Sequence, residues 1–102
     1  MEKEPTLDSQ FMEILGTGNV YFQPPESLKL RYPCIVYAKD GYKTQQADNK
    51  NYIISQKYSV TVIYEDPDEN ISKRILEHFS KCSFDRTYKA DNLYHDSLIL
   101  YY

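Results

Sequence analysis

The sequence predicts an α+β domain: a mostly antiparallel sheet of four to five strands with two helices packed on one face. Two observations indicate this class. The second half of the stretch 52–65 alternates residues between two faces with the period of a strand that buries one face. The stretches 5–15 and 67–80 instead repeat apolar residues at the spacing of amphipathic helices. Strands and helices do not alternate regularly along the chain, so a doubly wound parallel sheet is not expected.

The composition sets the first limits on function. A chain of 102 residues fits one domain, 1–102, with one hydrophobic core. The net charge of −3 gives no basic footprint for nucleic acid, and no apolar run approaches the ~20 residues that span a membrane. The N-terminal segment lacks the apolar core of a signal peptide, so we expect the chain to stay in the cytoplasm or in a particle assembled there. Eleven tyrosines suit a half-exposed sheet face or a protein-binding surface.

The first third of the chain predicts one helix and two strands. The helix at 5–15 has an apolar stripe and ends at Gly16, which suits a left-handed stop. A short strand at 20–22 is closed by two prolines. The run 34–38 is continuous and apolar, which is typical of a strand covered on both faces, and residues 39–41 either end that strand or form a bulge in it. The stripe of the helix consists of Leu7, Phe11, Ile14 and Leu15.

Residues 40–51 are polar and predict a long connection between two strands. Hairpin loops usually need only 2–5 residues, so a longer loop is either disordered or present for a purpose. The side chains of Asp48 and Asn49 can close a turn onto their own backbone. We therefore expect this segment to be either a loop that contacts a partner or simply a flexible loop.

The stretch 52–65 is expected to be the central strand. Its buried face would consist of Tyr58, Val60, Val62 and Tyr64. The helix at 67–80 follows, because Asp66 can cap it, Pro67 suits its first position and Glu69 completes a capping box. A strand at 82–88, a turn at 89–92 and a last strand at 95–102 complete the chain. The residues expected in the core are Ile35, Val60, Val62, Ile71, Ile75 and Leu98.

The chemistry-bearing residues do not predict an enzyme. Two cysteines and the two histidines, His78 and His95, lack the paired spacing of a zinc site. His95 and Asp96 are adjacent in a strand, so their side chains point to opposite faces and cannot form the orienting pair of a triad. We expect no cofactor and no metal. Cys34 and Cys82 are expected to be reduced, buried thiols.

Several segments, in their order and spacing, resemble the small tail-completion proteins (tail terminators, or head–tail joining proteins) of long-tailed bacteriophages and prophages. These segments are Tyr32–Tyr37, Ala47–Asn49, Tyr58–Ile63, Asp66–Asp68, Cys82–Arg86 and Ala90–Asp96. The resemblance spans residues 20–102, while the N-terminal helix matches only in type. Some relatives continue beyond the position of Tyr102, so a C-terminal contact that they make is not expected here.

The resemblance implies a structural protein of the virion. Such proteins form a ring, most simply a hexamer matching the tail, that caps the tail tube at the tail end. The implied partners are further copies of the chain, the tail tube protein and the head connector or stopper protein. The implied site of assembly is the bacterial host cytoplasm. DNA would pass through the ring without sequence-specific recognition, and no membrane is involved. Until it meets a tail end, the isolated chain is expected to be monomeric or weakly associating.

Nine residues are the expected interaction residues, because they lie in polar loops, turns or the segments that carry the resemblance. They are Tyr42, Lys43, Gln45, Asp48, Asn49, Asp85, Arg86, Asp91 and Asn92. An alternative function stays open: a small cytosolic module that binds protein or single-stranded nucleic acid through a Tyr-rich sheet face. Salt-sensitive binding of an oligonucleotide would favour the alternative, and phage genes on either side would favour the ring subunit.

Overall fold

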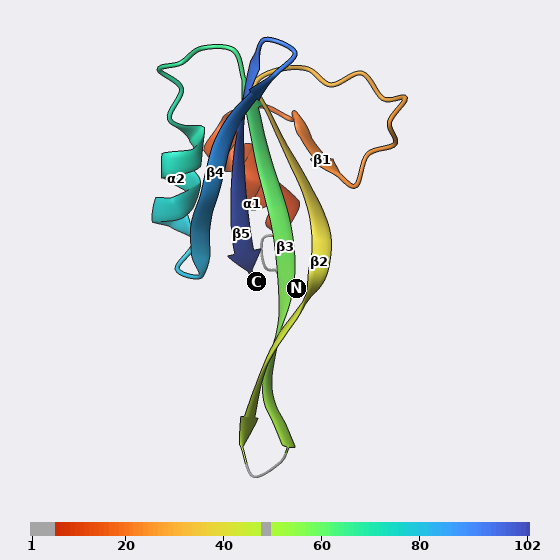
Figure 1. Ribbon diagram of the computed structural model, residues 1–102, viewed down its shortest axis with the longest axis vertical. Helices are drawn as coiled ribbons and strands as arrows, with labels where there is room; N and C mark the ends of the chain where they lie inside the picture. Colours follow the sequence, from red (N-terminus) through yellow and green to blue (C-terminus); the bar gives the residue numbers. More distant parts are fainter. Residues whose placement is uncertain (1–5, 48–49) are drawn as a thin grey trace, which may run out of the picture.

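The computed structural model describes residues 6–47 and 50–102, which form a five-stranded mixed sheet and two helices (Figure 1). The elements in chain order are α1 (Leu7–Leu15), β1 (Val20–Phe22), β2 (Cys34–Ala47), β3 (Lys50–Tyr64), α2 (Ile71–His78), β4 (Cys82–Ala90) and β5 (Leu93–Tyr101). The strands lie in the order β1-β2-β3-β5-β4, so β3 is central as predicted. Only β1 and β2 pair in parallel, and the other neighbours are antiparallel. The predicted α+β class is therefore confirmed.

Both ends of α1 have the residues that the backbone needs there. The Thr6 hydroxyl accepts a hydrogen bond from the Ser9 amide at 3.2 Å, which caps the first turn. Gly16 adopts a left-handed φ of 84°, and its amide donates to the Met12 carbonyl at 2.8 Å. The predicted first helical residue, Pro5, lies outside the described residues. The apolar stripe buries Leu7, Phe11 and Leu15 against the sheet.

Both helices pack on one face of the sheet, which we call the helical face. Register places Val62 between Ile35 and Asp96, and Val60 between Tyr37 and Leu98, with all of these side chains on this face. Phe11 of α1 and Ile71 and Ile75 of α2 close the core over it. The six predicted core residues are all buried, with exposed fractions of at most 1%. Full burial of each such side chain contributes about 1.5–3 kcal/mol.

The prediction of a connection at 40–51 is wrong, because β2 and β3 continue through it as a two-stranded ribbon. A bulge at Gly41, whose φ is 103°, shifts the register between Lys39 and Tyr42 without ending the strand. The pairing of β5 with β3 stops at Tyr101 opposite Lys57, so residues 42–47 and 50–56 project beyond the sheet (Figure 1). We call this ribbon the arm. Beyond Tyr101 the ribbon pairs with no third described strand, and residues 40–51 are mostly polar and do not alternate, which is why this part of the sequence resembles a loop.

The helix predicted at 67–80 is shorter and begins later, at Ile71. Asp66 does not cap it: its carboxylate accepts from the Asp68 amide at 2.9 Å, and its carbonyl accepts from the Glu69 amide at 3.0 Å. The acidic segment therefore folds as a turn of its own, in the way that Asp side chains compete with helix formation. The apolar stripe still lies where it was expected, since Ile71 and Ile75 are buried.

The last two strands form a tight hairpin at the end of the sheet opposite the arm (Figure 1). Asp91 and Asn92 have φ values of 52° and 63°, the left-handed pair that a two-residue turn of this kind requires. The predicted turn at 89–92 therefore shortens to two residues. β4 extends to Ala90 and β5 begins at Leu93. A register shift between Phe84 and Arg86 leaves Asp85 in a bulge.

Candidate functional site

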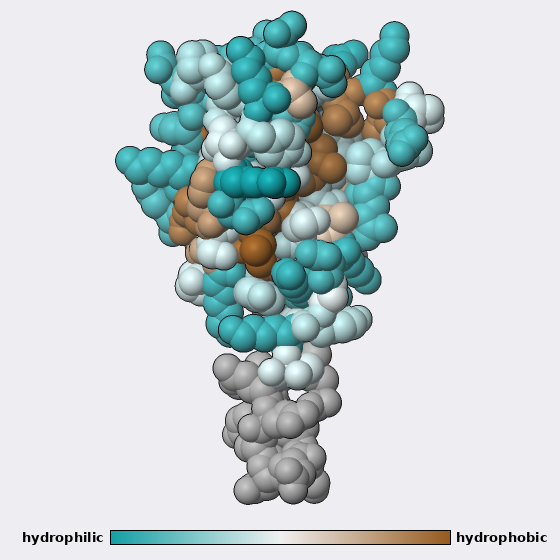
Figure 2. Space-filling model, viewed as in Figure 1, coloured by the Kyte–Doolittle hydropathy of each residue, from teal (hydrophilic) through white to brown (hydrophobic). Residues whose placement is uncertain are grey.

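The sheet face opposite the helices is uncovered over most of its width, and we call it the open face. Because successive side chains of a strand point to opposite faces, the residues that point away from the helices lie on this face. It consists of Val36, Ala38, Ser59, Thr61, Ile63, His95, Ser97 and Ile99, with Arg86 and Tyr88 on its β4 edge and Tyr101 at its arm end. Most of these side chains are half-buried. Figure 2 shows this face, on which apolar side chains form separate patches between hydrophilic ones.

Aromatic rings and cations gather at two places on the open face. Tyr88 stacks on His95 with ring centroids 4.9 Å apart and an interplanar angle of 10°. The Arg86 guanidinium lies 5.4 Å from the Tyr88 ring centroid. At the arm end, the Lys43 ammonium lies 5.2 Å from the Tyr101 ring centroid. Both contacts are within the range of cation–π attraction, so the rings hold these cations in place on the surface.

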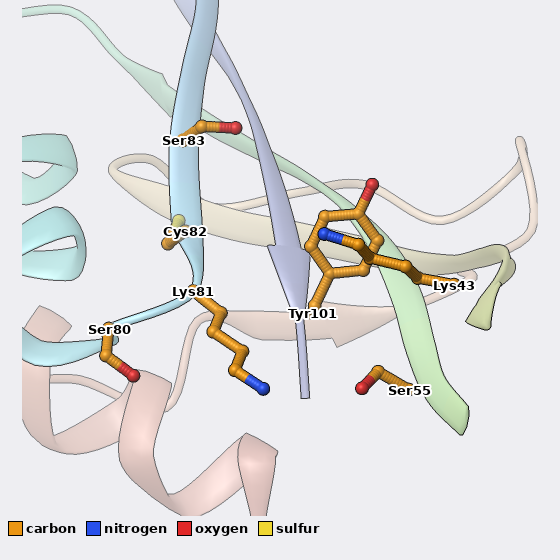
Figure 3. Close-up of a pocket in the computed structure, with 7 residues that line it drawn as sticks. All are labelled: Lys43, Ser55, Ser80, Lys81, Cys82, Ser83 and Tyr101. Carbon is orange, nitrogen blue, oxygen red and sulfur yellow. The ribbon is translucent and has the colours of Figure 1, made fainter. Parts of the chain in front are cut away.

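A cavity of about 360 Å³ lies where the arm leaves the sheet, and we call it the arm-base pocket (Figure 3). It exists because β3 continues into the arm while β5 stops, which leaves a recess beside the start of β4. Its lining consists of Lys43, Ser55, Ser80, Lys81, Cys82, Ser83 and Tyr101. Figure 3 shows the Lys43 side chain crossing the Tyr101 ring and the Lys81 side chain extending toward the end of β5.

The arm-base pocket is cationic in an acidic protein. No carboxylate is among its lining residues. Burial raises the pKa of the Cys82 thiol to about 11, so this group is neutral at pH 7. Within the described ranges, neither Lys43 nor Lys81 forms an ion pair, whereas Lys57 nearby lies 3.5 Å from Asp40. The ammonium groups of Lys43 and Lys81 are therefore two uncompensated positive charges, and the pocket can attract an anion.

A second polar group lies in the core, centred on Asp96, which is only 6% exposed. Its carboxylate accepts hydrogen bonds from Tyr64 at 3.0 Å, from Ser72 at 2.5 Å and from Thr87 at 2.7 Å. Burial, followed by the hydrogen bond to Asp96, raises the pKa of Tyr64 to about 12. These donors come from β3, α2 and β4, so the carboxylate ties three elements to β5. We interpret it as a structural network, because its oxygens are already engaged.

The structure places seven of the nine predicted interaction residues, at three places in the fold. Tyr42 and Lys43 lie on the arm, where the backbone of Gln45 continues β2, while Asp48 and Asn49 lie outside the described residues. The pair Asp85 and Arg86 lies at the β4 bulge. The pair Asp91 and Asn92 forms the turn at the far end of the sheet. Among those whose side chains the structure describes, only Lys43 lines the arm-base pocket.

Two features were missed from the sequence. The arm-base pocket depends on where β5 stops and β3 continues, so nothing in the local pattern singles out Lys81. Asp96, by contrast, can be recognised from the sequence, because it lies on the same face of the last strand as the apolar residues Leu98 and Leu100. An acidic residue on the apolar face of a strand indicates a buried carboxylate that needs hydrogen-bond donors.

The structure places the cysteines and histidines for which the sequence made predictions. His95 faces Tyr88 on the open face while Asp96 faces Tyr64 on the helical face, so the two neighbours do point apart. Cys34 and Cys82 are free thiols, but only Cys34 is fully buried and Cys82 is half-buried. Across residues 6–47 and 50–102, the structure brings together no group of three or more side chains that could hold a metal ion.

Neither helix in the described ranges is long and apolar enough to cross a bilayer. Comparisons with protein-family models, with curated proteins and with solved structures find no match to this chain. Function is therefore inferred from the residues and their geometry.

Proposed function

We propose that this protein is a structural subunit of a phage tail: a tail terminator that forms a ring on the tail tube and provides the head–tail joining interface. The observation that supports this most is the arm, a two-stranded ribbon that projects from one end of the sheet. Its partners in this proposal are further copies of the chain, the tail tube protein and the head connector protein.

The arm is suited to contact another molecule. A two-stranded ribbon is marginally stable alone in water, and three or more strands or a packed face are needed to stabilise it. Tyr42 on the arm is 69% exposed, and tyrosine is one of the residues that carry binding energy at protein interfaces. A partner that covers the arm would bury this ring and complete the packing that the ribbon lacks.

The open face supplies a second, different surface on the same chain. A closed ring requires each subunit to present two unlike surfaces that fit one another. The arm projects beyond the sheet, whereas the open face is broad and half-buried, with polar residues such as Thr61 on its central strand and apolar residues such as Val36 and Ile99 on the strands beside it. In our proposal, the arm of one copy lies on the open face of the next, and the repeated contact closes the ring.

We propose the tail end as the location because several segments of the sequence resemble tail-completion proteins. The net charge of −3 also suits a ring through which DNA passes without adhering. A hexamer would match the tail, and assembly would take place in the host cytoplasm on a finished tube. Free subunits would stay monomeric or associate only weakly, since a ring that closed in solution could not mark the end of a growing tail.

Deletion of the gene from its phage tests this function. We expect tails of uncontrolled length, or heads and tails that fail to join, when particles are viewed by electron microscopy. A plasmid copy of the full chain should restore infectivity. A variant in which an Asn-Gly turn replaces residues 44–54 should fold with an unchanged core but fail to restore it. Normal infectious particles from the deletion would contradict the proposal.

The Arg86, Tyr88 and His95 cluster favours the second candidate function, a module that binds single-stranded nucleic acid. Stacked aromatic rings with a nearby guanidinium on a sheet face are the elements on which successive bases stack. The test is binding of a single-stranded oligonucleotide measured over a range of salt concentration. Tyr88→Ala should abolish binding and Tyr42→Ala should leave it unchanged. Equal effects of the two changes would contradict this candidate.

A further inference from the structure

We propose that the arm-base pocket binds a phosphate ester, with Lys43 and Lys81 neutralising the phosphate and serine hydroxyls donating hydrogen bonds to it. This inference goes beyond the proposed function and does not depend on it. The pocket lies apart from the Tyr88–His95 stack, which is at the other end of the β4–β5 pair.

The pocket has the size and construction of a small-ligand site. Its volume of about 360 Å³ falls in the range of roughly 300–1,000 Å³ that ligand pockets occupy. Its walls come from segments far apart in the chain, namely the arm, the turn before β4 and the end of β5 (Figure 3). The space exceeds that of a bare phosphate, so a phosphate carrying a sugar or a similar polar group fits it best.

The charges of the pocket select an anion. Lys43 and Lys81 line the same cavity from different elements, and no described carboxylate pairs with either of them. Two like charges around one recess repel each other, and an anion between them removes that repulsion. A lysine ammonium binds phosphate as a compact point charge, and a phosphate ester carries enough negative charge to engage both lysines.

The neutral groups of the pocket complete the set of donors. The hydroxyls of Ser55, Ser80 and Ser83 line it, and none of them bonds to a side chain or backbone group within the described residues. Each can therefore donate to a phosphate oxygen. The Tyr101 ring is already covered by Lys43, so a base would not stack there. The charged and hydroxyl groups of the pocket therefore hold the ligand by its phosphate, and the sugar or similar polar group attached to it occupies the remaining space.

Titration of the ¹⁵N-labelled full chain tests this proposal. The probes are inorganic phosphate, a nucleoside monophosphate and a single-stranded oligonucleotide, and the readout is the amide signals of Ser83 and Tyr101. We expect saturable shifts of these signals, with Kd in the millimolar range or tighter. Lys81→Gln and Lys43→Gln should each weaken binding at least tenfold. Lys29→Gln, an exposed lysine in the β1–β2 connection, is the matched control and should leave Kd unchanged.

The results of this titration distinguish two sources of the phosphate, a free small ligand and a nucleic-acid backbone. Binding of phosphate and mononucleotide with no gain for the oligonucleotide would support a free small ligand. Tighter, salt-dependent binding of the oligonucleotide that still requires Lys81 would support a nucleic-acid backbone as the source of the phosphate. An equal loss of affinity in Lys29→Gln, or no shift of the pocket amides with any probe, would overturn the proposal. Melting temperatures of the variants exclude unfolding as the cause of lost binding.

Discussion

The hydroxyl oxygen of Ser72 on α2 lies 2.5 Å from a carboxylate oxygen of Asp96 on β5, which ties a helix to a central part of the sheet. Both residues are buried. Tyr64 and Thr87 donate to the same carboxylate from β3 and β4, so a single acid links α2, β3 and β4 to β5. Such a group specifies how the elements pack, because any other arrangement would leave its oxygens without donors.

Asp96→Ala should lower the free energy of unfolding by on the order of 3 kcal/mol, because three hydroxyls lose their acceptor and some of them stay buried. Urea denaturation measures the change. Asp68→Ala, which removes an exposed carboxylate, is the control and should change stability by less than about 0.5 kcal/mol. If the two variants unfolded at the same urea concentration, the network would not contribute to stability.

Stability should fall as the pH rises above 9. Burial raises the pKa of Cys34 and of Cys82 from 9.0 to about 11, and that of Tyr64 from 10.0 to about 12. Each group holds its proton more tightly in the folded chain than in the unfolded one, so its contribution is complete below the unfolded pKa and is lost between the two values. Thermal melting from pH 8 to 12 should show this decline. A flat profile would contradict it.

A matched pair of variants tests the contribution of Tyr64 to this decline of stability with pH. Tyr64→Phe removes a buried phenol and should reduce the decline between pH 10 and 12. Tyr42→Phe removes an exposed phenol on the arm and should leave the decline as it is in the parent. The comparison is of slopes, since Tyr64→Phe also takes one donor from Asp96 and lowers stability at every pH.

Val62→Asp should unfold the protein. Val62 is fully buried, and its cross-strand neighbour on β5 is Asp96, so the new carboxylate would be both unpaired and next to an existing acid. Circular dichroism at 25 °C would report the loss of structure. Ser59→Asp changes the same strand on the open face and should stay folded. A native spectrum for Val62→Asp would remove the basis for placing this residue in the core.

Cys34 should react with a thiol reagent only after unfolding. It is fully buried, and burial raises its pKa to about 11, so access and thiolate content both limit the rate. Cys82 is half-buried with a similarly raised pKa and should react at an intermediate rate. Labelling of the native Cys34→Ala and Cys82→Ala variants shows which cysteine reacts in each phase of the reaction. Rapid modification of the native Cys82→Ala variant would show that Cys34 is accessible.

The sequence was a good guide wherever one face of an element is buried. Alternation around Val60 and Val62 located the central strand, and the stripe through Ile71 and Ile75 located the second helix. Residues 40–51 are mostly polar and show no strand alternation, so this part of β2 and β3 was mistaken for a loop. The start of α2 was misplaced because Asp66 serves a local turn instead of a helix. The pocket could not be foreseen, since Lys43 and Lys81 meet only through tertiary structure.

The two ends of the sheet differ, and this gives the molecule a direction. At one end Asp91 and Asn92 reverse the chain within two residues, and at the other end the arm extends beyond every other strand (Figure 1). In the ring that we propose, copies that share one strand orientation would form a disc with one blunt surface and one surface bearing projections. The two surfaces of such a disc are different, so it could be placed between two different structures in only one orientation.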